Sequence, residues 1–181
     1  MPENRAWALP YLALVLNALV WGVSWWPLRE LQGEGLHPLW SSAFTYLLGA
    51  VVMLCFMPRV WSEFVRHKAL WLLALAAGTT MVGFNWGVSI GEVIRVVLLF
   101  YLMPIWAVLI ARVALNERIT LKALLRVGLA FAGAVLVLSP NGSLGFPLPS
   151  NLAEWLGLMG GAAFALNNIM LRHQAARTAQ A

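Results

Sequence analysis

The chain of 181 residues is 61% hydrophobic and only 10% charged, with a mean hydropathy of +0.79. Ordinary soluble domains are about 45–50% apolar and about 25% charged, so this composition excludes a soluble globular protein and indicates one embedded in a lipid bilayer. The net charge is +5, but the basic residues lie mostly between apolar stretches, which argues against a nucleic-acid partner. A lone cysteine, Cys55, and the lack of any aspartate offer little for a metal site, so we expect no metal and no other cofactor.

Six apolar stretches have the length of about 20 residues that crosses a hydrocarbon core about 30 Å thick. The first lacks a basic leading segment and a small-residue cleavage site, so we expect a retained helix rather than a signal peptide. The sequence therefore predicts an all-α, polytopic bundle of about six transmembrane helices. The predicted spans are 7–28, 39–57, 70–90, 94–114, 121–138 and 152–171.

The positions of lysine and arginine predict the orientation of the bundle, because these residues are retained on the cytoplasmic side in short loops. With six crossings and a cytoplasmic N-terminus, ten of the twelve lie inside, and Arg29 and Arg95 lie outside. Both chain ends are therefore predicted to be cytoplasmic. The uncharged, turn-rich segment 139–151 suits an outer loop, and Asn151 followed by Glu154 predicts the start of the sixth helix.

The usual catalytic motifs are missing from the sequence, so we do not expect an enzyme: there is no His-Glu-x-x-His, no Gly-x-Ser-x-Gly and no phosphate-binding glycine-rich loop. What remains is a set of polar and aromatic side chains at membrane depth, where polarity is costly and usually faces a cavity or another helix. We expect these residues to line a cavity for a small polar or amphiphilic solute. They are Asn17, Trp21, Asn85, Trp86, Arg95 and Tyr101.

Structural alternatives exist for these residues. An amide side chain in a membrane helix can simply hydrogen-bond to a neighbouring helix, which contributes roughly 0.6 kcal/mol. Arg95 could pair with Glu92 or with an anionic group on a substrate, or extend its guanidinium to the membrane interface. The sequence leaves these alternatives open.

Glycine and proline positions predict how two of the helices pack. Gly83, Gly87 and Gly91 recur every four residues, so one face of the third span has no side chains and allows another helix to approach closely. Pro104 lies well inside the fourth span, where it cannot donate to the carbonyl of Phe100, and predicts a kink.

Comparison of the chain with itself suggests a repeat. An offset of 143 residues lays Trp21-Gly22 on Phe164-Ala165 and Leu28-Arg29 on Leu171-Arg172. Five helices separate the two copies, so the second copy would cross the membrane in the opposite direction. This is the layout of inverted-repeat transporters, whose binding sites lie near the membrane midplane between the repeats.

Several motifs resemble those of one family in order and spacing. Trp21-Gly22 with Arg29 resembles the Trp-Gly-x6-Lys/Arg signature of EamA-type permeases of the drug/metabolite transporter superfamily. Leu102-Met103-Pro104-Ile105 and then Leu115-Asn116-Glu117-Arg118 are similar to that family's Leu-x-Pro helix and Leu-Gly-Glu-Arg turn, with asparagine in place of glycine. The segment from Gly128 to Leu138 resembles its glycine-rich fifth helix.

The resemblance implies a ten-helix fold of two inverted five-helix repeats. Residues 1–138 would form the first repeat, 139–151 an outer loop, and 152–181 the first helix of the second repeat with a cytoplasmic tail. It also implies a secondary transporter in the bacterial cytoplasmic membrane that exports a small metabolite, an amino acid or a toxic compound.

Six predicted spans are fewer than ten, so we expect the chain to need a missing C-terminal half or a homodimeric partner. The alternative is a truncated or non-transporting membrane subunit that assembles with another chain.

Overall fold

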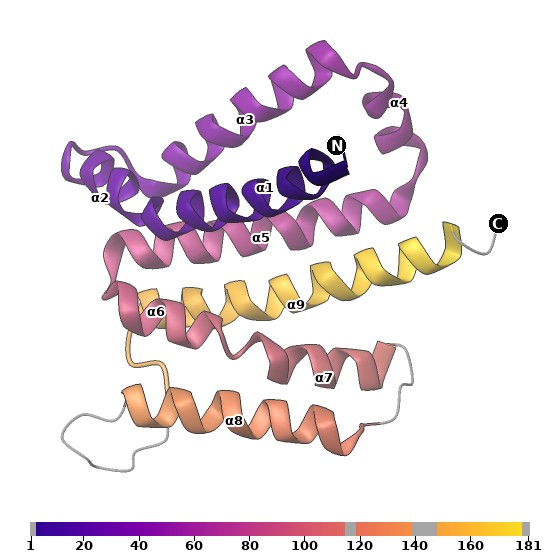
Figure 1. Ribbon diagram of the computed structural model, residues 1–181. Coiled ribbons are helices and arrows are strands. Elements are labelled where there is room, and N and C mark those ends of the chain that lie inside the picture. The colour runs from indigo at the N-terminus through magenta and orange to yellow at the C-terminus, as the bar shows by residue number, and fades with distance from the viewer. Residues whose placement is uncertain (1–2, 115–118, 139–147, 179–181) are drawn as a thin grey trace.

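The computed structural model describes residues 3–114, 119–138 and 148–178, and every regular element in these ranges is an α-helix (Figure 1). Within the described residues, four helical segments are long and apolar enough to cross a membrane: Pro10–Gly33, Pro38–Phe56, Lys68–Ile90 and Val93–Ala114. The chain is therefore an all-α polytopic bundle, as predicted. The helices are α1 (Glu3–Val23), α2 (Trp25–Gly33), α3 (Pro38–Phe56), α4 (Arg59–Arg66), α5 (Lys68–Ile90), α6 (Val93–Phe100), α7 (Met103–Ala114), α8 (Leu121–Leu138) and α9 (Leu152–Thr178).

The helix bounds follow the predicted spans closely. The third predicted span is α5, and α8 and α9 begin where the fifth and sixth are predicted. The helix α9 continues to Thr178, beyond the predicted end at residue 171. The short helix α4 was not predicted; it begins after Pro58, and its aromatic side chains Trp61 and Phe64 stack with centroids 6.2 Å apart.

Two of the predicted spans are each divided into two helices, and a proline explains both breaks. The helix α1 ends at Val23, four residues before Pro27, and α6 ends at Phe100, four residues before Pro104. A proline has no amide hydrogen to donate to the carbonyl four residues earlier, and its ring crowds that carbonyl. At the first break Ser24 donates its hydroxyl to the carbonyl of Trp21 at 3.0 Å, which satisfies one of the carbonyls at the helix end.

The best-packed part of the molecule is the contact of α9 with α5 and α6 (Figure 1). A methyl group placed on Gly83 would lie 2.7 Å from the carbonyl oxygen of Leu156, and one placed on Gly157 would lie 2.7 Å from that of Val96. The backbones are therefore in contact without intervening side chains. Small residues allow this approach, and it gains van der Waals contact that lipid tails cannot supply.

The outer helices present a continuous apolar surface. Leu14 and Leu16 in α1 and Leu48 in α3 are each more than 60% exposed, and α1 packs mainly against the α2 that follows it. In water such a surface would drive association, but in a bilayer it faces lipid. The lipid bilayer is thus the environment that this chain requires.

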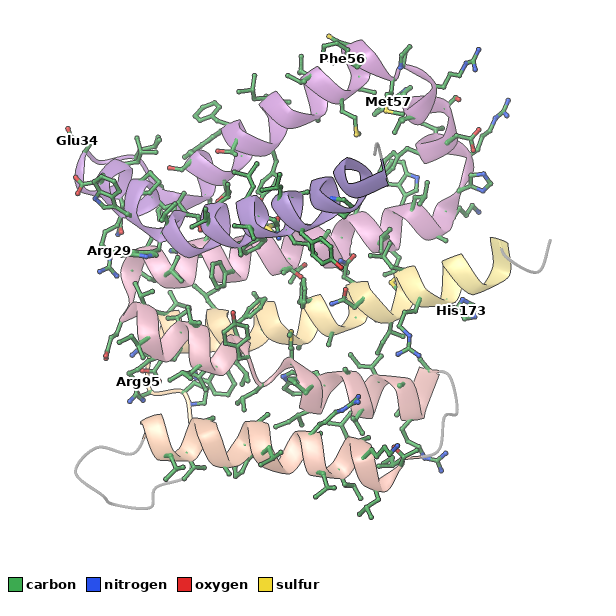
Figure 2. The ribbon with its side chains drawn as sticks, viewed as in Figure 1. Arg29, Glu34, Phe56, Met57, Arg95 and His173 are labelled. Atoms are coloured by element: carbon green, nitrogen blue, oxygen red, sulfur yellow. The ribbon has the colours of Figure 1, made fainter. Side chains whose placement is uncertain are left out.

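The two ends of the bundle carry different charges (Figures 1 and 2). The N- and C-termini lie at the same end, with His173, whereas Arg29, Glu34 and Arg95 lie at the other end. We call these the basic end and the acidic end. Among the described side chains, the basic end holds Arg59, Arg66, Lys68, Arg112, Lys122, Arg126 and Arg172 with Glu63, and the acidic end holds Glu30, Glu34, Glu92 and Glu154 with Arg29 and Arg95.

The glycine contact gives a direct test of packing. Substituting Gly83→Ala should destabilise the protein by about 1–3 kcal/mol, because the new methyl group overlaps the backbone of α9. The matched control is Gly78→Ala on the same helix, where no heavy atom lies within 4 Å of the new methyl group. Thermal unfolding in detergent measures both variants, and equal stability would contradict the close approach of α9.

The charge asymmetry gives a test of orientation. In a Cys55→Ser background, Glu34→Cys at the acidic end should react with a membrane-impermeant maleimide in intact cells. Arg59→Cys at the basic end should react only after the membrane is permeabilised, because basic ends are retained in the cytoplasm. The reverse labelling pattern would contradict a cytoplasmic N-terminus.

Candidate functional site

An ion pair between α6 and α9 is the most clearly organised polar feature of the acidic end. The Nε atom of Arg95 lies 2.7 Å from Oε1 of Glu154, and its Nη2 atom lies 3.3 Å from Oε2. The Glu154 side chain is only 4% exposed, and that of Arg95 is 28% exposed. A two-point pairing of this kind fixes direction as well as distance. It ties the start of α6 to the start of α9.

The remaining hydrogen-bond capacity of Glu154 is met by its own chain. Ser150 donates its backbone amide at 2.9 Å and its hydroxyl at 3.1 Å to Oε2, and Asn151 donates its side-chain amide to Oε1 at 3.0 Å. The backbone amide of Glu154 in turn donates to Oδ1 of Asn151 at 3.1 Å. These bonds form a variant of the capping box, in which the Glu154 carboxylate accepts from the Ser150 backbone amide and the Asn151 side chain. They confirm the predicted start of the sixth helix. They also explain how a buried carboxylate is tolerated.

Arg29 of α2 caps the C-terminal end of α5. Its Nη2 atom donates to the carbonyl of Val88 at 3.0 Å and also to the carbonyl of Gly91, at the C-terminal end of α5. The last carbonyls of a helix lack internal partners and carry partial negative charge, so a guanidinium is favoured there. The Arg29 guanidinium also lies 5.8 Å from the ring centroid of Trp25. Arg29 therefore fastens α2 to α5.

Asn85 is buried between helices. Its side-chain amide donates to the hydroxyl of Ser42 at 3.0 Å, which joins α5 to α3. The backbone carbonyl of Asn85 accepts from the hydroxyl of Ser89 at 2.7 Å. The next residue, Trp86, packs edge-on against His37 with ring centroids 5.2 Å apart. Asn85 therefore makes the hydrogen bond to a neighbouring helix that the sequence left open as an alternative to lining a cavity.

Aromatic rings from four helices meet beside this region. Trp21 of α1 contacts Phe84 of α5 at a centroid distance of 5.3 Å, and Phe84 contacts Phe100 of α6 at 5.1 Å. Phe100 also contacts Phe164 of α9 at 5.6 Å. The edge-on contacts suit the charge distribution of aromatic rings. This chain of rings connects the first helix to α9 through the centre of the bundle.

The remaining predicted residues do not converge on one enclosed space within the described ranges. Asn17 lies on the exposed face of α1, and Tyr101 is 57% exposed at the break between α6 and α7. A methyl group on Gly22 would have no neighbour within 4 Å. Glu117 lies outside the described residues. The role of these side chains in a substrate cavity stays a prediction.

One cavity lies at the basic end, between α7, α8 and α9, and has a volume of about 310 Å³. Its lining includes Pro104, which lies in the first turn of α7, just after the break between α6 and α7. A smaller surface hollow of about 300 Å³ lies at the break between α1 and α2, against Val23, Trp25 and Trp26.

Two features of the site escaped the sequence analysis. Glu154 was interpreted only as part of a helix start, and Glu92 was considered as the partner of Arg95. Because Asn151 and Glu154 form a capping box, the carboxylate points back over the first turn of α9 and meets the start of α6. The glycines of α9 were also missed, although Gly157, Gly160 and Gly161 stand at the small-residue spacing that indicates close packing.

Comparison with known proteins gives one match. The model of the EamA-like transporter family matches residues 8–139. No curated protein and no solved structure matches the chain. The matched range covers the described helices from α1 to α8 and ends before α9.

The ion pair can be tested by a double-mutant cycle. Glu154→Gln should cost about 1–3 kcal/mol of stability, because it replaces the charge-assisted hydrogen bonds of the half-buried Arg95 guanidinium to this carboxylate by neutral ones. Arg95→Gln should cost less stability when it is added to Glu154→Gln than when it is made in the natural chain, because the interaction is already lost. The control is Glu92→Gln, an exposed carboxylate three residues from Arg95, which should leave the unfolding temperature unchanged. A loss in the control as large as in Glu154→Gln would contradict this pairing.

Proposed function

Because the chain belongs to the EamA-like transporter family, we propose that it is a secondary transporter that exports a small metabolite, an amino acid or a toxic compound across a bacterial cytoplasmic membrane. The family and the apolar helices make the chain a multi-pass membrane protein of the drug/metabolite transporter type. The substrate class, the direction and the inner membrane are the parts that we propose.

The observation that carries the proposal is the difference between the two ends of the bundle. At the acidic end the Arg95–Glu154 pair and the Arg29 contacts hold α2, α5, α6 and α9 together. At the basic end α7, α8 and α9 together line a cavity of about 310 Å³. A bundle closed at one end and open at the other supports alternating access, in which the two ends open in turn around a fixed site.

The break at Tyr101–Leu102 supports a hinge for this motion. The helices α6 and α7 form one membrane segment but are separate helices, and both contact α9. Hinges are short segments that absorb backbone rotation while the flanking helices stay rigid. We propose that α7 swings relative to α6 about this break, which would widen or narrow the cavity that Pro104 lines.

The substrate-contacting residues in this proposal are those predicted from the sequence. The chain of rings through Trp21, Phe84, Phe100 and Phe164 supports a site that accepts flat or amphiphilic solutes, because aromatic walls offer apolar contact with few fixed polar demands. Asn85 and Arg95 would have to exchange Ser42 and Glu154 for a substrate. The side chains of Trp21, Trp86 and Tyr101 make ring contacts, so they would reach a substrate with less rearrangement.

Flux through reconstituted vesicles tests the proposal. Vesicles with the purified chain should release radiolabelled amino acids or a cationic dye at a saturable rate, and an excess of unlabelled substrate should compete. The matched control is a pair, Arg95→Cys with Glu154→Cys, in a Cys55→Ser background. A short bifunctional thiol reagent should bridge this pair, hold the acidic end closed and abolish the flux of the double variant. The same reagent should leave the flux of each single variant at the level measured before treatment.

The two arms of this experiment separate transport from its mechanism. Saturable flux that survives bridging would contradict opening at the acidic end. Flux that never exceeds that of protein-free vesicles, from a monodisperse sample, would contradict transport by this chain.

A second candidate is a membrane subunit that acts with further helices. It is supported by Asn17, a polar residue on the exposed face of a predicted membrane helix. Polar side chains in membranes nearly always face protein or a water-filled cavity. In this reading a second copy or a further set of helices would cover the Asn17 face of α1, and flux would appear only in their presence.

A further inference from the structure

The cavity at the basic end has an unusual lining. Three of its side chains are arginines, and each comes from a different helix: Arg112 from the last turn of α7, Arg126 from α8 and Arg172 from α9. Thr120, just before α8, adds a hydroxyl. None of the described residues that line the cavity is acidic. Three helices thus direct positive charge at one space of about 310 Å³.

The electrostatics of this space favour an anion. Arg112 lies in the last turn of α7, where the partial negative charge of the helix end offsets part of its positive charge. Arg126 differs, because the nearest end of α8 is its N-terminus, which is already positive. The walls between the charges are apolar, and include Ala107, Val108 and Val127. Like charges set in apolar walls focus the field into the cavity.

The arginines have enough hydrogen-bond donors to bind a ligand while they keep their present contacts. Arg112 and Arg172 already interact within the chain. A guanidinium carries five N–H donors in a planar fork, so it can serve a protein group and an anion at the same time. The same fork matches the oxygens of a phosphate group and binds them in pairs.

The shape of the cavity limits the size of the anion. Its volume is at the lower end of the range of about 300–1,000 Å³ found for small-ligand sites. Pro104 lies near the start of α7 and Arg112 near its end, so the lining along α7 changes from apolar to charged. A phosphate group with a short apolar or glycerol attachment satisfies both parts of this lining.

We propose that the cavity between α7, α8 and α9 binds a phosphate-type anion through Arg112, Arg126 and Arg172. The phosphate belongs either to an anionic phospholipid headgroup or to a free, soluble phosphate. Basic pockets between helices at the cytoplasmic side of a membrane are suited to both. Occupancy would join α7 to α8 and α9, and would thereby stabilise the basic end.

Thermal unfolding of the purified chain in nanodiscs tests this inference and separates the two sources. One arm titrates inorganic phosphate into nanodiscs of phosphatidylcholine. The other arm compares these nanodiscs with nanodiscs that also contain phosphatidylglycerol. A rise in the unfolding temperature with phosphatidylglycerol alone identifies the headgroup, and a rise with phosphate identifies a soluble anion.

Variants assign the effect to the cavity. Arg126→Gln and Arg172→Gln should each weaken the response roughly tenfold in anion concentration, as expected for the loss of one charged hydrogen-bond donor. Arg59→Gln removes a charge from the basic end outside the cavity lining and should leave the response unchanged. Arg126→Lys keeps the charge but lacks the planar fork, so it should respond more weakly than the natural chain. It serves as the conservative variant if Arg126→Gln does not fold.

Two outcomes would overturn the inference. One is the absence of stabilisation by both phosphate and phosphatidylglycerol. The other is an equal loss of response in Arg59→Gln and Arg126→Gln, which would show that the anions act on the general charge of this end. Because the readout is binding rather than flux, the result does not depend on whether the chain transports a solute.

Discussion

The close approach of α9 to α5 and α6 is the constraint on which the rest of the structure depends. In a bilayer, apolar side chains gain nothing by leaving lipid for protein, so helices associate through tight packing and polar contacts. Gly83, Gly87 and Gly157 supply that packing by bringing the backbones together. The outer helices have no comparable contact, and α1 and α3 remain largely exposed. The molecule is accordingly rigid at its centre and loosely held at its edge.

The polar contacts of the acidic end follow from this packing. Arg95 can meet Glu154 only because Val96 sits against Gly157, which sets the start of α6 beside the start of α9. The capping box then supplies the other hydrogen bonds that the buried carboxylate needs. A buried ion pair contributes little net stability but strongly penalises any register in which its partners are separated. The pair therefore specifies how α9 is placed, and the glycine contact supplies the affinity.

The sequence was sufficient to place the helices along the chain but not to show which helices pack together. Length and apolarity placed α3, α5 and α8 to within a few residues, and the proline rule located the break before Pro104. The same rule applied to Pro27 would have found the break before α2. Glycine spacing showed which face of α5 would be covered, but not by which helix. The partner of Arg95 could not be found, because Glu154 is 59 residues away and only the packing of α9 brings it near.

The direction of α9 gives the charge asymmetry a structural meaning. It runs from the acidic end to the basic end, whereas α1 runs from the basic end to the acidic end (Figure 1). A second set of helices that continued from α9 would cross the membrane in the opposite direction to the first set. Its basic residues would therefore have to lie in different loops of the repeat to stay in the cytoplasm.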